Sequence, residues 1–185
     1  VLLTHRNITS NAEGAQTIFP LEESDRTLSF LPWAHSFGQT VELHCGTGYG
    51  ISLALCDDTT RLVEYLGEVK PTLLFAVPRI FNKIYDGLHK KMAAESAFKQ
   101  RMFKSAVSAA QRKRALDLEG KRSGFLNFKL KILDKLVFSK VRARLGGRLR
   151  YAFSGGAAIS REVAEFIDDT GILVYEGYGL SETPP

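Results

Sequence analysis

The sequence predicts an α/β fold in which helices cover both faces of a mostly parallel sheet. Short apolar runs recur along the chain and alternate with segments of helical periodicity. Runs of this kind are typical of strands that are buried on both faces of a parallel sheet. The chain has 185 residues, of which 44% are hydrophobic, and this is enough for one core of ordinary size. We therefore expect one domain rather than several.

Five apolar runs are expected to form the strands, namely residues 27–31, 51–55, 72–77, 149–153 and 172–175. A polar helix is predicted before the first strand, from Thr4 to Phe19, because Pro20 ends its pattern. Three further helices are expected between strands, over residues 35–45, from the capping residues 57–60 to Gly67, and after Ser160.

A long helical excursion is predicted between the third and fourth strands, over residues 79–148. Apolar residues recur every fourth position from Ile80 to Met92, and a second stripe with spacings of three and four runs from Leu126 to Leu145. These stripes predict two amphipathic helices, joined near the glycine-containing segment 120–124.

Charge is distributed unevenly along the chain. Residues 79–150 hold 20 Lys/Arg and 5 Asp/Glu, whereas the remaining residues hold 5 and 15. The basic residues can be the solvated faces of amphipathic helices, and an anionic membrane surface is a second interpretation. Nucleic acid is not the expected partner, because the aromatic residues lie near the apolar stripe rather than among the charges.

Several protein classes are excluded. No apolar run reaches the roughly 18 to 20 residues of a membrane span, and no signal peptide is visible at the start. The two cysteines, Cys45 and Cys56, are too few for a disulfide scaffold, so a reducing, cytoplasmic setting is expected. The chain also lacks a P-loop, a nucleophile elbow and the residue spacing of a zinc site.

Three loops that follow predicted strands combine residues suited to ligand binding, because parallel sheets bind ligands at the carboxyl ends of their strands. The first holds His35, and the second offers the small residues Gly155, Gly156 and Ala157. The third, residues 176–183, combines an aromatic ring, backbone amides, two hydroxyls and a carboxylate. Taken singly, these residues are more often found in a tight turn, as a solvated carboxylate or as a histidine at a helix start.

Together the loops resemble a known family. LPWAHSFG at 31–38, VPRIF at 77–81, SGGA at 154–157 and YGLSET at 178–183 occur in the order seen in AMP-forming adenylating enzymes. The opening VLLTHRN resembles the segment directly after that family's phosphate loop. VPRIF with a basic helical excursion after it is most similar to the long-chain fatty acyl-CoA synthetases. The resemblance spans essentially the whole chain.

The resemblance implies a ligase that uses ATP and Mg²⁺, with coenzyme A as co-substrate. A long-chain fatty acid would first form an acyl-AMP, and the thiol of coenzyme A would then displace AMP. Two alternatives stay open within this class: transfer of the acyl group to a carrier protein, and an aryl or medium-chain acid as substrate. The alternative outside enzymes is a basic module that binds membranes or nucleic acid.

The resemblance also implies roles for individual residues. Gly155, Gly156 and Ala157 would line the adenine and acyl site, and Tyr178 would pack on the adenine. Ser181 stands where the family commonly has Thr and would contact phosphate. Glu182 would hold Mg²⁺, and His35 would border the acyl and nucleotide pocket; these two are the catalytic candidates. The remaining expected nucleotide-binding residues are Glu176, Gly177, Gly179 and Leu180.

The same resemblance bears on domain organisation. Residues 1–185 would form a single partial adenylation domain, a central fragment of the family's large N-terminal domain. The phosphate loop would precede Val1, and the family's ribose-binding Asp and C-terminal catalytic Lys would come after Pro185. The isolated chain is therefore expected to be inactive.

Overall fold

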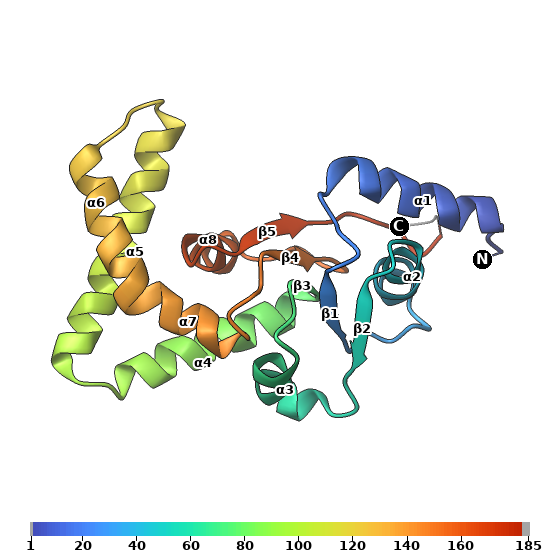
Figure 1. Cartoon of the computed structure of the whole chain (residues 1–185), viewed down its shortest axis with the longest axis horizontal. Helices are drawn as coiled ribbons and strands as arrows, with labels where there is room; N and C mark the ends of the chain where they lie inside the picture. Colours follow the sequence, from blue (N-terminus) through green and yellow to red (C-terminus); the bar gives the residue numbers. More distant parts are fainter. Residues whose placement is uncertain (1, 183–185) are drawn as a thin grey trace.

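The computed structural model describes residues 2–182 and contains a five-stranded sheet in which all strands are parallel (Figure 1). The strand order is β2-β1-β3-β4-β5. The strands are β1 (Arg26–Ser29), β2 (Ser52–Leu55), β3 (Leu73–Ala76), β4 (Tyr151–Ser154) and β5 (Leu173–Glu176). The predicted fold class and all five predicted strands are thus confirmed, with ends that shift by one or two residues.

Helices cover both faces of the sheet. One face packs against α1 (His5–Ile18), the π-helical segment η1 (Gly38–His44) and α2 (Cys45–Gly48). The other packs against α3 (Leu62–Val69), which follows the 3₁₀ turn η2 (Thr59–Arg61), and against α4 (Pro78–Ala93) and α8 (Arg161–Asp169). In β3, Leu73 and Phe75 face the first layer, and Leu74 and Ala76 face the second. The strand is therefore buried on both sides, as its uninterrupted apolar sequence predicted.

Local chemistry fixes the helix starts that the sequence indicated. Thr4 caps α1 in a reciprocal capping box with Asn7. The Ser160 hydroxyl accepts a hydrogen bond from the backbone N–H of Val163 at 3.3 Å, and Glu162 lies in the first turn of α8.

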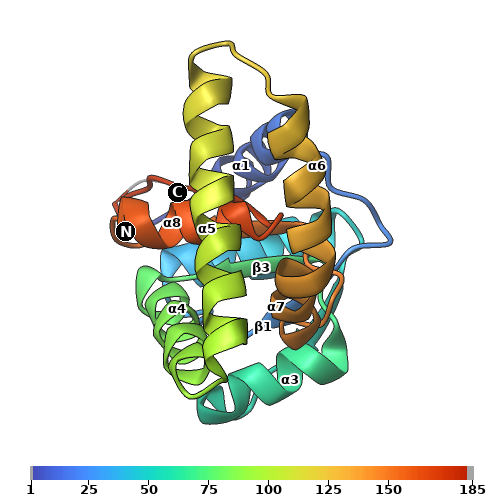
Figure 2. The ribbon, with the colours of Figure 1, turned by 90° about the vertical axis from the view of Figure 1, so that its left-hand side faces the viewer.

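The helical excursion contains three long helical segments, not the two that the apolar stripes predicted. These segments are α4, α5 (Ala97–Leu118) and a continuous run of α6 (Gly124–Leu133), η3 (Asp134–Phe138) and α7 (Ser139–Arg144). The chain turns at residues 94–96, where the Gln100 amide nitrogen donates to the carbonyl oxygens of Ala93 and Glu95 at 3.0 and 2.8 Å. Such side-chain donors satisfy carbonyls that a helix end leaves unpaired, so the helix can stop there. Helices α5 and α6 lie side by side beyond the sheet (Figure 2).

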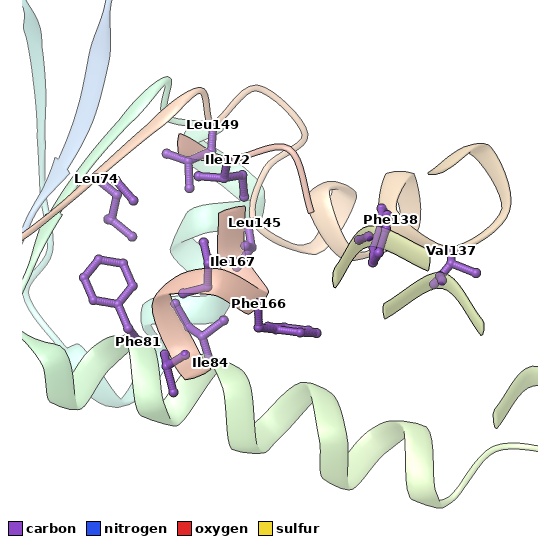
Figure 3. Packing of buried hydrophobic residues seen from close by; sticks show 14 of the residues in the cluster. Leu74, Phe81, Ile84, Val137, Phe138, Leu145, Leu149, Phe166, Ile167 and Ile172 are labelled. Carbon is purple, nitrogen blue, oxygen red and sulfur yellow. The ribbon is translucent and has the colours of Figure 1, made fainter. Parts of the chain in front are cut away.

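One of the two apolar clusters joins the excursion to the sheet. Phe81 and Ile84 of α4 point toward Phe166 and Ile167 of α8 (Figure 3), and this cluster continues through α5 to η3. Tyr85 adds a polar tie, because its hydroxyl donates to Glu162 at 2.8 Å.

Ion pairs also connect the basic excursion to the acidic body. Arg114 of α5 pairs with Glu165 at 2.6 Å and with Asp169, whose side chain is 6% exposed. Just after the excursion, Arg150 pairs with the buried Asp25 at 2.7 Å. Part of the charge asymmetry therefore serves to attach one part of the fold to the other. Within residues 2–182, no helix combines the length and the hydropathy that crossing a bilayer requires.

Candidate functional site

The three candidate loops follow β1, β4 and β5, and the motif at 77–81 follows β3. All four segments therefore begin at the carboxyl edge of the sheet. From β1 the chain continues to β2 on one side, whereas β3 pairs on the other side of β1. This arrangement places a topological switch point between β1 and β3, which is the usual ligand position in open α/β sheets. The segment 31–38 begins on one side of that point and residue 77 on the other.

A buried polar network anchors the loop after β1. The Ser29 hydroxyl donates to the Glu42 carboxylate at 2.5 Å, and the Trp33 indole N–H lies 3.2 and 3.3 Å from the same two side chains. Glu42 is fully buried in η1, and its Oε1 has no hydrogen-bond partner among the described residues. Burial raises the pKa of Glu42 despite the hydrogen bonds from Ser29 and Trp33.

Sequence reasoning missed Glu42. A carboxylate between Val41 and Leu43 in an apolar stretch is the only sequence signal that could have indicated its burial.

His35 lies exposed in the turn that follows Trp33. Its Nδ1 accepts a hydrogen bond from the backbone N–H of Phe37 at 3.2 Å. In the neutral imidazole the proton is then on Nε2, which is left free to donate to a ligand. The Phe37 ring reaches the loop after β4: a Cβ built on Gly155 would lie 2.7 Å from two of its ring atoms. The first and second candidate loops are therefore in direct contact.

Backbone hydrogen bonds align the ends of three strands. The Gly155 N–H donates to the Ala76 carbonyl at 3.2 Å, and the Gly177 N–H donates to the Ser154 carbonyl at 2.8 Å. Gly156 adopts a φ of +80°, a conformation that side-chain-bearing residues rarely adopt. The two glycines are therefore required for different reasons. Gly155 leaves room for the Phe37 ring, and Gly156 adopts a backbone conformation with positive φ.

Glu176 closes the loop after β4 onto the end of β5. Its Oε1 accepts a hydrogen bond from the Ile159 backbone N–H at 3.1 Å. One oxygen of this expected nucleotide-binding residue is therefore engaged in holding the loop that contains Ala157.

The rest of the third loop is exposed. Tyr178 is 89% exposed, and Gly179, Leu180, Ser181 and Glu182 also lie at the surface. Within the described part of the chain, residues 178–182 form no hydrogen bond with other residues, and none links them to His35. Thr183, the last residue of the motif, lies outside the described residues.

The carboxylates at this edge suit a cation that is bound jointly by the protein and by the phosphates of a bound nucleotide. Among residues 2–182, no three His, Cys, Asp or Glu side chains are grouped closely enough to bind a metal ion. Mg²⁺ commonly binds through one or two carboxylates plus phosphate oxygens and water, so the exposed Glu182 suits that mode.

Burial raises the pKa of the Cys45 thiol to about 11, which makes that thiol a poor nucleophile.

Comparison with known proteins establishes the family. The family model for AMP-binding enzymes matches residues 1–185, which is the whole chain. The chain belongs to the AMP-binding enzyme family. The resemblance of its four loop motifs is thereby confirmed.

Two curated relatives are similar to this chain over nearly all of its length. It is 36% identical to the peroxisomal long chain acyl-CoA synthetase 6 of Arabidopsis thaliana, over 99% of this chain and 25% of that protein. It is 35% identical to the long-chain-fatty-acid–CoA ligase FadD15 of Mycobacterium bovis, over 98% of this chain and 30% of that protein. The chain thus spans between a quarter and a third of their length.

The fold agrees with a solved structure. The A-PCP didomain of carboxylic acid reductase from Segniliparus rugosus, in complex with AMP, superposes with a TM-score of 0.59 at 22% sequence identity. The match covers 96% of this chain and 21% of that one. At this identity it demonstrates a shared fold.

Proposed function

We propose that this chain carries the nucleotide- and acyl-handling loops of an ATP-dependent, AMP-forming long-chain fatty acid:CoA ligase. Residues 1–185 are then a single partial adenylation domain, with the excursion 79–148 within it. The observation that supports this most directly is the meeting of the loops along the carboxyl edge of the sheet, where Phe37 packs on Gly155 and the Gly177 N–H donates to the Ser154 carbonyl. The names of the two relatives above support the reaction class.

The reaction consists of two displacements. A carboxylate oxygen of the fatty acid bonds to the α-phosphorus of ATP, and the bond from that phosphorus to pyrophosphate breaks. The sulfur of coenzyme A, after losing its proton, then bonds to the acyl carbon, and the bond from that carbon to the AMP oxygen breaks. The chain supplies no covalent nucleophile for either step, so its contribution is positioning and electrostatic stabilisation.

The exposed loops suit these roles. Gly155, Gly156 and Ala157 allow close approach of the adenine and the acyl group, and the ring of Tyr178 offers a stacking face. The backbone amides of 178–180 and the hydroxyl of Ser181 can donate to phosphate oxygens. Glu182 would hold Mg²⁺, which neutralises charge as pyrophosphate leaves.

His35 acts at the border between nucleotide and acyl group. Its backbone turn and the Phe37 N–H fix the ring, and its free Nε2 can donate to a carboxylate or phosphate oxygen.

Binding of ATP to this chain tests the site. Trp33 is the single tryptophan and lies in the loop after β1, so its fluorescence reports ligand binding there. We expect ATP with Mg²⁺ to quench it saturably, and Glu182→Gln to weaken the Mg²⁺-dependent part about tenfold. Glu119→Gln, an exposed carboxylate of the excursion, is the matched control. Equal ATP affinity of the Glu182→Gln variant and the parent chain would contradict the assignment.

The full reaction is tested in a longer protein that includes this segment. Palmitate should support release of pyrophosphate, and coenzyme A should then yield palmitoyl-CoA. A carrier-protein acceptor or an aryl or medium-chain acid would instead leave palmitoyl-CoA undetected. The 185-residue chain alone is expected to produce no acyl-CoA under the same conditions.

We also propose an anionic membrane surface as a partner, at a cytoplasmic location. Phe125, Phe128 and Ile132 form an exposed apolar stripe on α6, between 45% and 80% exposed. Lysines flank it, namely Lys121, Lys129, Lys131 and Lys135. Aromatic residues beside lysines suit the boundary between lipid head groups and acyl chains.

The basic cluster at 112–114 is less suited to this role, because Arg114 is engaged with Glu165 and Asp169. Sedimentation with phosphatidylserine vesicles tests the stripe. Phe125→Ser with Phe128→Ser should abolish sedimentation, whereas Arg112→Glu should reduce it only slightly. Retention of duplex DNA in a gel shift at the same salt concentration, without vesicle binding, would favour the nucleic-acid interpretation instead.

A further inference from the structure

The helical excursion contains a cavity of about 370 Å³ at the junction of α4, α5, η3 and α7. These elements meet at the end of the molecule away from the carboxyl edge of the sheet (Figure 1). The wall is mainly apolar and is formed by Leu88, Met92, Phe98, Met102, Leu136 and Val141. Phe98 is 71% exposed, so part of this apolar wall faces solvent. The volume lies within the range of small-molecule sites.

Basic side chains surround the cavity. Four line it, namely Lys91, Lys99, Lys140 and Arg144, against the single carboxylate of Glu95. Glu95 pairs with Lys99 at 2.8 Å, and the pKa of Glu95 is lowered by that bond and further by Lys91 and Arg144. Among residues 2–182, Lys91, Lys140 and Arg144 have no ion-pair partner. The cavity thus joins an apolar interior to an excess of positive charge.

We propose that this cavity binds the monomeric anion of a single-chain fatty acid, with the chain against the apolar wall and the carboxylate among Lys91, Lys140 and Arg144. These three side chains are exposed at the rim, so they attract an anionic head group and gain nothing from a neutral lipid. A nucleotide would need hydrogen-bonding groups for its base, and Ser96 is the single uncharged polar residue in the wall. The match between an anionic head group and the basic rim therefore selects the ligand class.

The inference does not rest on the proposed function, because it depends on the lining of the cavity alone. It adds a second place for a fatty acid, outside the loops that follow the strands. Such a site would hold an acyl chain on the protein while the nucleotide loops are free or occupied.

Calorimetric titration with laurate below its micelle concentration tests the proposal on the 185-residue chain. We expect saturable binding with one site, about tenfold weaker binding of dodecanol, and no binding of dodecyltrimethylammonium. Lys140→Glu combined with Arg144→Glu should weaken laurate binding about tenfold or more, and Met102→Trp should block it by filling the cavity. Arg112→Glu combined with Lys113→Glu, on α5 outside the cavity, is the matched charge control.

Each outcome distinguishes this site from its alternatives. Excess ATP with Mg²⁺ should not displace laurate, and its displacement would assign the fatty acid to the nucleotide loops and overturn the proposal. Equal laurate affinity of the Lys140→Glu/Arg144→Glu variant and the parent would also overturn it. A chain that does not bind monomeric laurate overturns it too. Vesicle sedimentation that is lost in Lys140→Glu/Arg144→Glu but kept in Phe125→Ser/Phe128→Ser would then assign membrane lipid to the cavity. ATP binding monitored by Trp33 should be unchanged in these variants, so the two proposals can fail separately.

Discussion

The ring of Phe37 lies directly against Gly155, so two loops that are more than 100 residues apart in sequence share one contact at the carboxyl edge of the sheet. Two ring atoms lie 2.7 Å from the position that a Cβ on Gly155 would take, and real Cβ atoms do not come that close. The spacing between the loop after β1 and the loop after β4 is therefore set by a glycine.

Gly155→Ala should destabilise the chain by about 1 to 3 kcal/mol, because the added methyl group overpacks against Phe37. In a Phe37→Ala background the same substitution should cost at least about 1 kcal/mol less, since the clash is removed. Gly156→Ala is the control: it should cost about 1 to 2 kcal/mol through its positive φ, with or without Phe37. Urea unfolding measures these differences in Phe37→Ala and in each glycine variant with and without Phe37→Ala. If Gly155→Ala lowered the free energy of unfolding equally in both backgrounds, the contact with Phe37 would not be tight.

Arg114→Ala should cost about 3 kcal/mol at neutral pH, because it leaves the nearly buried Asp169 carboxylate without its cation. Arg112→Ala, on an exposed position of the same helix, should change the free energy of unfolding by less than about 0.5 kcal/mol. Thermal unfolding of both variants is the measurement. A similar loss for both would assign the effect to helix propensity rather than to the ion pair.

The cost of Arg114→Ala should also depend on pH. Burial raises the pKa of Asp169, while Arg114 lowers it in part, so removing Arg114 leaves the pKa higher still. A carboxyl with a raised pKa in the folded state destabilises that state as pH rises above its unfolded value. The penalty should therefore shrink between pH 7 and pH 5, where more of Asp169 is protonated. A penalty that stays constant across this range would rule out the buried charge as its cause.

The contribution of Asp25 to the free energy of unfolding should depend on pH in the opposite direction to that of Asp169. Burial alone raises the pKa of Asp25, but hydrogen bonds from the Thr72 hydroxyl at 2.5 Å, the Glu22 backbone and Arg150 outweigh it, so the pKa lies below its usual range. The resulting stability is present above about pH 4 and is lost as pH falls through the folded pKa. Asp25→Asn should cost about 1 to 3 kcal/mol at pH 7 and remove that acid dependence. Glu13→Gln, an exposed carboxylate of α1, should leave the acid limb of the stability curve unchanged.

Glu42→Gln should gain stability relative to the parent chain as pH rises from 5 to 8. Burial raises the pKa of Glu42, so deprotonation at higher pH weakens the parent, whereas the glutamine amide stays neutral. Glu42→Ala should instead lose about 2 to 3 kcal/mol, since it opens a cavity and leaves Ser29 and Trp33 without their acceptor. Trp33 fluorescence provides a second readout, with a red shift expected in Glu42→Ala alone. If the parent chain instead became more stable relative to Glu42→Gln with rising pH, the raised pKa of Glu42 would be contradicted.

The order of strands and helices could be read from the sequence because it depends on local patterns. Runs such as 72–77 are too apolar for a solvated strand, and Pro20, Pro32 and Pro78 mark boundaries through fixed backbone chemistry. The turn between α4 and α5 was missed because the apolar stripe of α4 ends without Gly or Pro. The turn depends on Gln100 folding back to the end of α4, which is a contact between helices.

The sequence by itself determined the fold class, the five strands and the four loop motifs, since periodicity and residue type carry that information. The tertiary structure alone decided that Phe37 contacts Gly155, that Glu42 is buried beneath Trp33 and that Arg114 is bound to Asp169. These relationships join residues far apart in the chain or depend on which side of a helix faces the core. Burial changes the pKa of a carboxylate only after those neighbours are in place, so local sequence does not encode it.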